Sequence, residues 1–312
     1  MEQRGAIRYA CSRLLSAVPT LFFVIGFAFL MMHAAPGGPF DQERRLPDDV
    51  RANIEAHYHL DEPLAVQFGN YLGGLFRADL GPSFRRVDYD VAELIGQSAP
   101  ISFLLGSLAF GLALAAGIGA GVCAALHRNT LLDRFVTGAA IAGISVPVLV
   151  VAPLLALVFA VLLGVLPASW TGATDGSQLV LPVVALALSQ IAHIARLVRA
   201  SMIDVLGSDF IRTARAQGLR TWTVIRRHAF KPAMLPLLSY MGPAVAAILA
   251  GSVVVEEVFG IPGLGRLFVT AATGRDYTLI LGIVILYATL VILLNLAVDI
   301  LYGFLDPRIR NR

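Results

Sequence analysis

The side chains best suited to contact a partner gather in the polar segment 196–232. This segment holds eight Arg and Lys residues between two apolar stretches, and it is too polar to cross a membrane. Its pattern predicts two short amphipathic helices joined by a turn. Such a pair can lie on lipid headgroups, can cap a helical bundle, or can dock into a groove on a soluble protein. The pattern by itself leaves these three alternatives open.

In the first of these two helices, Phe210, Ile211 and Ala214 are expected to share one face at helical spacing. Arg212 and Arg215 are then turned away from that face. A guanidinium group binds carboxylates or backbone carbonyls through paired hydrogen bonds. The exposed side of this helix is therefore suited to a protein partner that offers oxygen acceptors.

The turn between the two helices is predicted at Gly218. A glycine can adopt the left-handed conformation that ends a helix, because it has no Cβ atom to clash. The second helix should start near Thr221 and bury Trp222 and Ile225. It should end at Pro232, since proline lacks the N–H group that a helix interior needs.

A second candidate chemistry is nucleophilic. Ser145, in a Gly-Ile-Ser triplet, and His193, in a later apolar stretch, could form the base-activated pair of an intramembrane serine protease of the rhomboid type. However, Ser145 lies two residues before Pro147, where a hydroxyl commonly satisfies a kinked helix. The sequence has neither a clustered set of Cys and His metal ligands nor the pattern G-x-x-x-x-G-K-[ST]. The chain is therefore not expected to hold a metal or to hydrolyse ATP.

The elements that must position these residues are membrane spans. Hydrophobic residues make up 57% of the 312 residues and charged ones only 14%, too few to solvate the surface of a globular domain. This excludes a soluble enzyme, a disordered chain and a nucleic-acid binder, and predicts an all-α membrane protein. Six stretches are long and apolar enough to cross a bilayer, and Pro147 and Pro153 should bend the third. The stretches are residues 14–32, 101–126, 135–163, 181–198, 234–255 and 279–304.

The distribution of Arg and Lys sets the orientation of these spans. The segments on the amino-terminal side carry 16 basic residues and the opposite segments carry 8. Because basic loops stay in the cytoplasm, both termini are predicted to be cytoplasmic. The organisation that follows has four parts. These are a tail with the first span (1–32), a periplasmic segment (33–100), a five-helix core (101–304) that includes the cytoplasmic loop 199–232, and a cytoplasmic tail (305–312).

The spans contain few ionisable groups. Besides the intramembrane protease, an ion-driven secondary carrier is an alternative for a chain with six spans. Such a carrier usually needs acids or histidines within its spans to bind the driving ion. Because no dense set of them is present, energy for uphill transport should come from a partner.

At residues 212–236 the chain resembles the permease subunits of ABC importers. Residues 212–214 occupy the E-A-A positions of their E-A-A-x-x-x-G loop motif, without the Glu, and Gly218 occupies the glycine. The forms R-T-A-R-A-x-G-L at 212–219 and R-H-A-x-x-P-A-x-L-P at 227–236 are typical of the peptide and nickel branch. Further matches occur in order along the chain: A-P-G at 35–37, D-L-G-P-S at 79–83, Glu256, F-G-I-P-G-L-G at 259–265, R-D-Y at 275–277 and D-P-R at 306–308. Segment 36–95 is most similar to the B-subunit permeases of oligopeptide importers, with dipeptide or nickel permeases as the alternative.

This resemblance implies a type I ABC importer transmembrane domain in the bacterial inner membrane, and not an enzyme. Expected partners are a second homologous permease, two ATPase subunits that bind ATP and Mg, a periplasmic peptide-binding protein and membrane lipid. No cofactor in this chain and no nucleic acid are expected. The residues expected to contact the ATPase are Phe210, Ile211, Arg212, Thr213, Ala214, Arg215, Ala216, Gln217, Gly218, Leu219 and Trp222. Ser145, Ser189 and Glu256 are expected along the substrate pathway.

Overall fold

The computed structural model describes residues 2–34, 61–86, 88–172 and 176–305. Residues 35–60 of the predicted periplasmic segment and the tail 306–312 therefore lie outside the described residues. The chain divides into two compact units. Unit 1 comprises Met1–Arg13, Phe103–Ile261 and Val291–Arg312, and unit 2 comprises Leu14–Ser102 and Pro262–Leu290.

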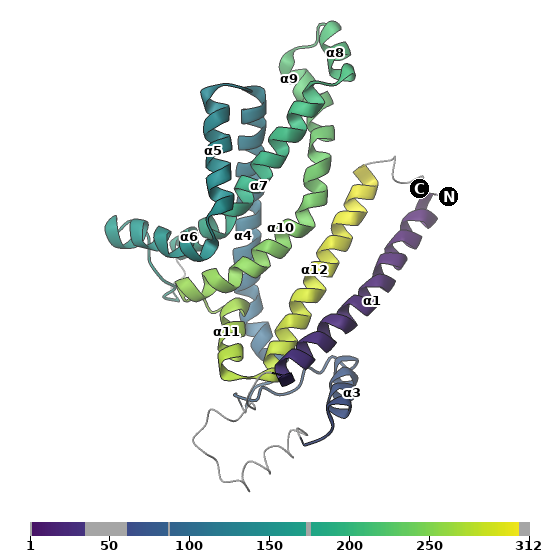
Figure 1. Cartoon of the computed structure of the whole chain (residues 1–312), viewed down its shortest axis with the longest axis vertical. Helices are drawn as coiled ribbons and strands as arrows, with labels where there is room; N and C mark the ends of the chain where they lie inside the picture. The colour runs from purple at the N-terminus through teal and green to yellow at the C-terminus, as the bar shows by residue number, and fades with distance from the viewer. Residues whose placement is uncertain (1, 35–60, 87, 173–175, 306–312) are drawn as a thin grey trace. The chain divides into compact units, whose positions relative to one another are not determined.

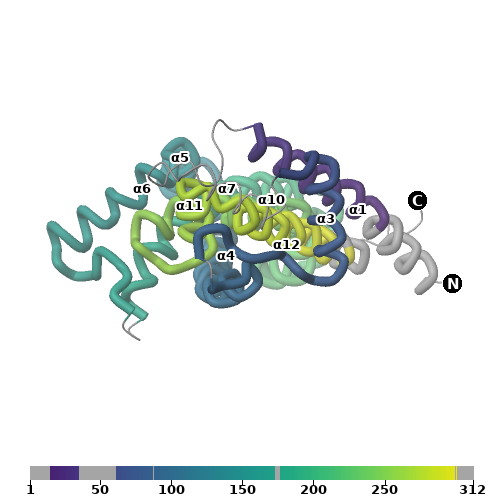
Figure 2. The backbone as a smooth tube through the Cα atoms, turned by 90° about the horizontal axis from the view of Figure 1, so that it is seen from below, coloured from purple at the N-terminus to yellow at the C-terminus, as the bar shows by residue number. Residues whose placement is uncertain are grey.

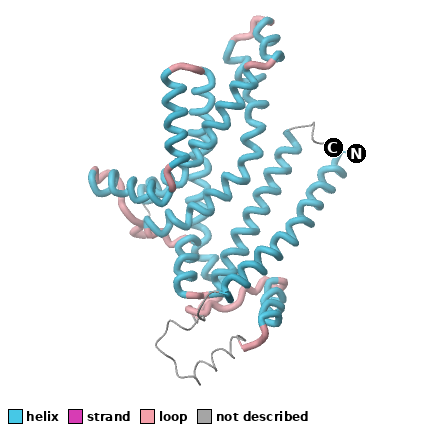
Figure 3. Tube along the Cα trace, viewed as in Figure 1, coloured by secondary structure: helices cyan, strands magenta, loops and turns pink. Residues whose placement is uncertain are grey.

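The described residues form helices joined by loops (Figures 1 and 3). They contain no β-strand, and the nearest approach to one is an isolated bridge between Pro82 and Asp90. The α-helices are α1 (Glu2–Ala34), α3 (Leu64–Leu75), α4 (Val91–Leu126), α5 (Leu131–Ser145), α6 (Val148–Leu155), α7 (Val180–Leu206), α8 (Asp209–Ala216), α9 (Thr221–Thr223), α10 (Phe230–Phe259), α11 (Leu264–Gly274) and α12 (Tyr277–Leu305). Two π-helical stretches (Ala156–Leu162 and Val224–Ala229) and one 3-10 turn (Gly176–Leu179) complete them.

Five of the described helices are long and apolar enough to cross a membrane, and a bent pair would make a sixth span. The pair consists of Leu131–Ser145 and Val148–Leu162, which meet at an angle of 105°. Both views show α6 leaving α5 sideways (Figures 1 and 2). The six predicted apolar stretches agree with five unbroken spans and one bent pair. The bent pair corresponds to the third predicted stretch.

The break in the third stretch follows from Pro147, as predicted. The residue before a proline is pushed out of helical geometry, and Val146 is extended with ψ 119°. Pro147 then becomes the residue that precedes the new helix α6. Pro153 lies inside α6, one turn before the π-helical stretch begins at Ala156.

In unit 1, small residues allow α4 and α7 to approach closely. A Cβ atom added at Gly117 would lie 2.8 Å from the Cβ atom of Ile194, and one at Gly121 would lie 2.8 Å from the Cβ atom of Val198. Real side chains do not pack at such distances, so a methyl group at either glycine would force the helices apart. Close backbone contact between small residues is a common way to pack helices in a membrane.

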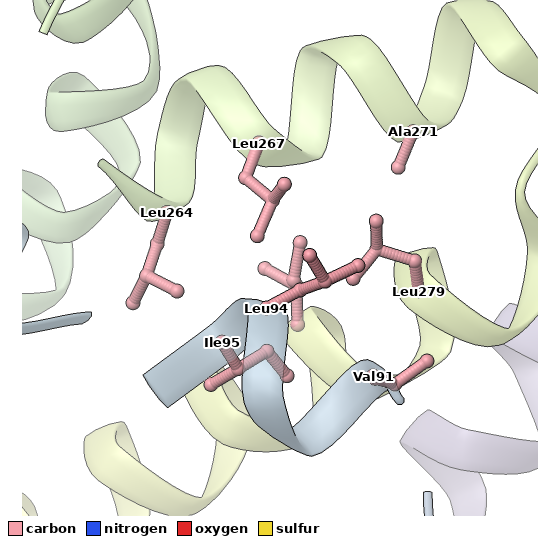
Figure 4. Packing of buried hydrophobic residues seen from close by; sticks show 8 residues of the cluster. Val91, Leu94, Ile95, Leu264, Leu267, Ala271 and Leu279 are labelled. Atoms are coloured by element: carbon pink, nitrogen blue, oxygen red, sulfur yellow. The ribbon is translucent and has the colours of Figure 1, made fainter. Parts of the chain in front are cut away.

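In unit 2, the start of α4 packs against α11 and the start of α12 (Figure 4). The buried cluster consists of Val91, Leu94, Ile95, Leu264, Leu267, Ala271, Leu279 and Ile283. Beside it, Ser83 donates a hydrogen bond to the buried carboxylate of Asp276. The backbone N–H groups of Phe84 and Leu279 also donate to this carboxylate, at 3.1 and 3.3 Å. The D-L-G-P-S and R-D-Y motifs, 193 residues apart at Ser83 and Asp276, thus meet in one hydrogen-bond network.

Candidate functional site

Helix α8 is held on unit 1 by two buried side chains. Ile211 is fully buried and Ala214 nearly so, as predicted. They join a cluster that the ends of α4 and α7 and the start of the fifth span provide; its other members are Ala125, Met202, Val224, Ile225, Ala229 and Ala233. This cluster, called the α8 base below, fixes the helix to the membrane domain through apolar packing.

Phe210 does not share the buried face, contrary to the prediction. Its side chain is 49% exposed. The contact with the α8 base is centred between Ile211 and Ala214. Phe210 lies about 100° around the helix from Ile211. It therefore borders the contact and points partly into solvent.

Gly218 ends the α8 turn in the predicted left-handed conformation. Its φ is +79°, and its N–H group donates to the carbonyl of Arg215 at 3.0 Å. A Cβ atom built at Gly218 meets nothing within 4 Å. The requirement for glycine here is therefore one of backbone conformation and not of space.

The second predicted helix differs from the prediction in two respects. Trp222 is 68% exposed, and Val224 is buried in the α8 base together with Ile225. Pro232 does not end the helix, because the chain is helical without interruption from Thr221 to Phe259. Pro232 lies three residues after a π-helical stretch that ends at Ala229.

The exposed part of this region combines apolar and basic side chains. We call it the docking face. Its apolar members are Phe210, Leu219 and Trp222, and its basic members are Arg212, Arg215, Arg220, Arg226 and Arg227. Thr213, Ala216, Gln217 and Gly218 are exposed between them. The nearest acid, Asp209, pairs with Arg212 at 3.4 Å, with both side chains in solvent.

An ion pair that the sequence pattern did not reveal lies next to the α8 base. Arg199 on α7 binds Asp133 in the first turn of α5 through two hydrogen bonds of 2.5 and 2.8 Å. The N–H group of Asn129 donates to the same carboxylate at 2.9 Å. The pair places loop 127–130 and the end of α7 on one side of unit 1. Its only sequence signal was an acid beside basic residues at the start of a span.

The serine–histidine pair of the protease alternative is not formed. The hydroxyl of Ser145 donates to the carbonyl of Ile141 at 2.8 Å, and the Nδ1 atom of His193 bonds the carbonyl of Ser189 at 2.9 Å. Each group thus satisfies the backbone of its own helix. This is the alternative role that the sequence suggested for Ser145.

The three predicted pathway residues have different environments. Ser145 is exposed at the end of α5, Ser189 is half-buried in α7, and Glu256 is fully buried near the end of α10. Near Ser189 the structure shows a polar group that the sequence analysis missed. Tyr240 on α10 donates to Gln190 at 3.0 Å, and His193 stacks on its ring with centroids 6.0 Å apart.

Apolar spans and an exposed basic loop on a buried base are the features of a membrane protein that can bind a partner at one end. The chain belongs to the family of binding-protein-dependent transport system inner membrane components, which it matches over residues 117–311. It is therefore a multi-pass inner-membrane protein and not an enzyme. This result replaces the intramembrane protease and the ion-driven carrier as interpretations.

Comparison with individual proteins shows which members of this family the chain is similar to. It is 51% identical to the oligopeptide transport system permease protein OppB of Escherichia coli (strain K12), over 97% of this chain and 99% of that protein. It is 41% identical to the dipeptide transport system permease protein DppB of Bacillus subtilis (strain 168), over 97% and 98%. A solved structure of the MetNI methionine ABC transporter in an inward-facing conformation shares the fold, with a TM-score of 0.56 at 18% identity over 68% of this chain and 96% of that one. The predicted ABC importer permease fold is thereby confirmed.

Proposed function

We propose that this chain is the permease subunit of an ATP-driven importer that takes up oligopeptides. The 51% identity to an oligopeptide permease along almost the whole chain supports this substrate class. The weaker identity of 41% to a dipeptide permease makes dipeptides the second candidate. A periplasmic binding protein would deliver the peptide, and a second homologous permease would complete the pathway.

The docking face is the observation that supports the proposal that ATP hydrolysis by partner subunits drives import. Exposed apolar side chains ringed by arginines, on a helix held by a buried base, form a surface suited to a protein partner. In the proposed assembly two ATPase subunits bind ATP and Mg below the membrane. Their closure would press on the docking face and turn the pathway from inward-facing to outward-facing.

In this mechanism the spans would form the pathway for the peptide and would not themselves hydrolyse ATP. Both termini would be cytoplasmic, as the distribution of basic residues indicates. Ser145, Ser189 and Glu256 remain the proposed pathway residues, and the Tyr240–Gln190–His193 group beside Ser189 extends this set. Polar side chains within a span are costly and are usually retained for function.

The test is to tag the chain, extract it mildly from native membranes and measure what co-purifies. We expect a second permease and ATPase subunits in fixed ratio. After reconstitution, ATP hydrolysis should rise when peptide-loaded binding protein is added. A lone chain at good yield, with no ATPase activity, would contradict the proposal. Stimulation by dipeptides but not by longer peptides would support the second candidate substrate.

A further inference from the structure

Helix α7 contacts three neighbouring helices of unit 1 in three different directions. Ile194 and Val198 lie against glycines of α4. Ala192 and Arg199 face α5, and Gln190 accepts a hydrogen bond from α10. Because consecutive residues are about 100° apart around a helix, these contacts leave their widest gap between the α5 and α10 sides of α7. Figure 1 shows α5 and α10 on opposite sides of α7.

This part of the α7 surface carries polar side chains. At helical spacing Ser189, His193 and Arg196 fall between Gln190 and Ala192, on the side away from α4. Arg196 is exposed, and Ser189 and His193 are half-buried. Polar groups within a span are costly to place against lipid, so they usually face a pathway or the interior of a bundle. We therefore expect this side of α7 to line the pathway for the substrate.

Arg196 lies deeper in the span than the ion pair of Arg199. Arg199 is one turn closer to α8 and binds Asp133 in the first turn of α5. At about 1.5 Å per residue, Arg196 and His193 lie about 5 and 9 Å further into the span than Arg199. Arg196 forms no ion pair with any residue that the structure describes. Since Asp133 is bound to Arg199, the charge of Arg196 is available to a ligand.

The imidazole of His193 is held in a fixed orientation beside Arg196. Its Nδ1 atom donates to the carbonyl of Ser189 at 2.9 Å, so the Nε2 atom of the neutral ring is an acceptor. Tyr240 of α10 stacks on the imidazole and donates to Gln190 at 3.0 Å. The charge of Arg196 also acts on the hydroxyl of Tyr240. His193, Arg196 and Tyr240 thus gather between α7 and α10.

These groups specify the chemistry of a ligand. A guanidinium has five donors and no acceptor, so Arg196 requires oxygen atoms and pairs best with a planar carboxylate. The Nε2 atom of His193 requires an N–H group, and it lies three residues away on the same helix face. The carboxyl end of a peptide offers both, a carboxylate and the N–H group of its last peptide bond. A phosphate group offers oxygens alone and matches only Arg196.

We propose that Arg196 and His193 form a site that binds the carboxyl end of the transported peptide as it passes along α7. This inference rests on the function proposed above and names the substrate group that this part of the pathway recognises. Arg196 binds the terminal carboxylate, and His193 accepts the N–H group of the last peptide bond. Tyr240 is a positioning residue, because it holds the imidazole. The site holds the peptide only briefly, since a pathway must also release what it binds.

Transport of a matched pair of peptides tests the role of Arg196. The pair is one pentapeptide with a free carboxyl end and the same pentapeptide with an amide end. Uptake by the reconstituted complex is measured with the binding protein saturated by either peptide. Arg196→Gln should lower the ratio of free-acid to amide uptake roughly five-fold, because the amide lacks the charge that Arg196 binds. Arg128→Gln, at an exposed arginine between α4 and α5, is the matched control and should leave the ratio unchanged.

The possible results separate this inference from the proposed function. Partial recovery of the ratio by Arg196→Lys would support a charge-based contact. An unchanged ratio in Arg196→Gln would overturn the inference and leave the proposed function intact. If that variant also loses bound phospholipid in native mass spectrometry, Arg196 binds a lipid headgroup instead. No ATP-driven uptake of either peptide by the unaltered complex would overturn both.

A second peptide pair tests the role of His193. His193→Phe keeps an aromatic ring against Tyr240 but removes the acceptor. It should slow uptake of the free-acid pentapeptide about two-fold, as the loss of one hydrogen bond does. Uptake of the same peptide with an N-methylated last peptide bond should not change, because that peptide has no N–H group to donate. Equal effects on both peptides would overturn the contact with His193.

Photo-crosslinking with the unaltered chain locates the peptide end without any substitution in the protein. A photoreactive phenylalanine analogue stands at either the last or the first residue of the pentapeptide, and the complex is trapped with vanadate during turnover. We expect the last-residue probe to form adducts within residues 189–200 or beside Tyr240, and the first-residue probe to form none there. Adducts in these places from the first-residue probe alone, or from neither probe, would overturn the inference.

Discussion

The loop that contains Gly218 and the loop that contains Asp276 both carry motifs of the family, yet their polar groups behave in opposite ways. Around Gly218 the charged side chains are exposed, and both members of the Arg212–Asp209 ion pair on α8 lie in solvent. Around Asp276 the carboxylate is buried and accepts hydrogen bonds from Ser83, Phe84 and Leu279.

This difference separates two uses of a sequence motif. A buried acid that accepts several hydrogen bonds fastens one part of a chain to another, because leaving it without donors would be costly. The exposed arginines around the apolar centre have no buried partner of this kind among the described residues, and Arg212 pairs with Asp209, which is itself in solvent. We therefore expect these arginines to bind another protein. Substitutions in the Gly218 loop should affect transport, and substitutions in the Asp276 loop should affect stability.

The largest expected effect is on transport, from a change at the Gly218 turn. Gly218→Asp should insert in the membrane and still bind the second permease, yet lose nearly all peptide uptake, because it strains the turn and adds an acid to a basic docking face. Gly172 is the matched control, since it has the same φ of +79° and equally open space but lies in a loop predicted to face outward. Uptake is measured in cells and assembly by co-purification. Normal uptake by Gly218→Asp would contradict the assignment of this loop to coupling.

The sequence predicts well what depends on local chemistry. The apolar stretches, the break at Pro147 and the left-handed turn at Gly218 each follow from residues within a few positions of one another. The burial of Ile211 and Ala214 follows from helical spacing.

Features that depend on distant contacts were missed or wrong. The Asp133–Arg199 pair joins residues 66 positions apart, and one sequence cannot show which acid meets which base. The exposure of Trp222 was predicted wrongly because an indole normally favours burial, whereas here Val224 fills the position in the α8 base. The helix continues past Pro232 and contains a π-helical stretch at Val224–Ala229, and the sequence pattern indicates neither feature.

The next largest effect should be on stability, from the buried acid of unit 2. Asp276→Ala removes the acceptor of the Ser83 hydroxyl and of the backbone N–H groups of Phe84, Arg85 and Leu279. The loss should be about 2–3 kcal/mol in the free energy of unfolding, since buried donors are left without partners. Thermal unfolding in detergent measures it, with exposed Asp88→Ala in the same unit as the control. An unchanged melting temperature would show that the network does not fasten unit 2.

A smaller but diagnostic effect is expected at the ion pair beside the α8 base. Asp133→Asn keeps the shape of the side chain but removes the charge that Arg199 binds. We expect a lower melting temperature and reduced uptake, because loop 127–130 and α7 are no longer held together below α8. Exchanging the two residues, Asp133→Arg with Arg199→Asp, should recover part of the stability if the charge pair itself matters. If the exchange is worse than either single change, the hydrogen bond from Asn129 and the local packing dominate.

The smallest expected effect is at Arg212, and it tests the contrast between the two loops most directly. Arg212 is 75% exposed and its partner Asp209 is 96% exposed. A pair of this kind on a helix surface contributes less than about 0.5 kcal/mol to stability. Arg212→Ala should therefore leave the melting temperature unchanged, while binding of the purified membrane complex to its ATPase subunits becomes weaker and less sensitive to salt. A clear loss of stability would show that Arg212 fastens the chain internally, as Asp276 does, and would remove it from the docking face.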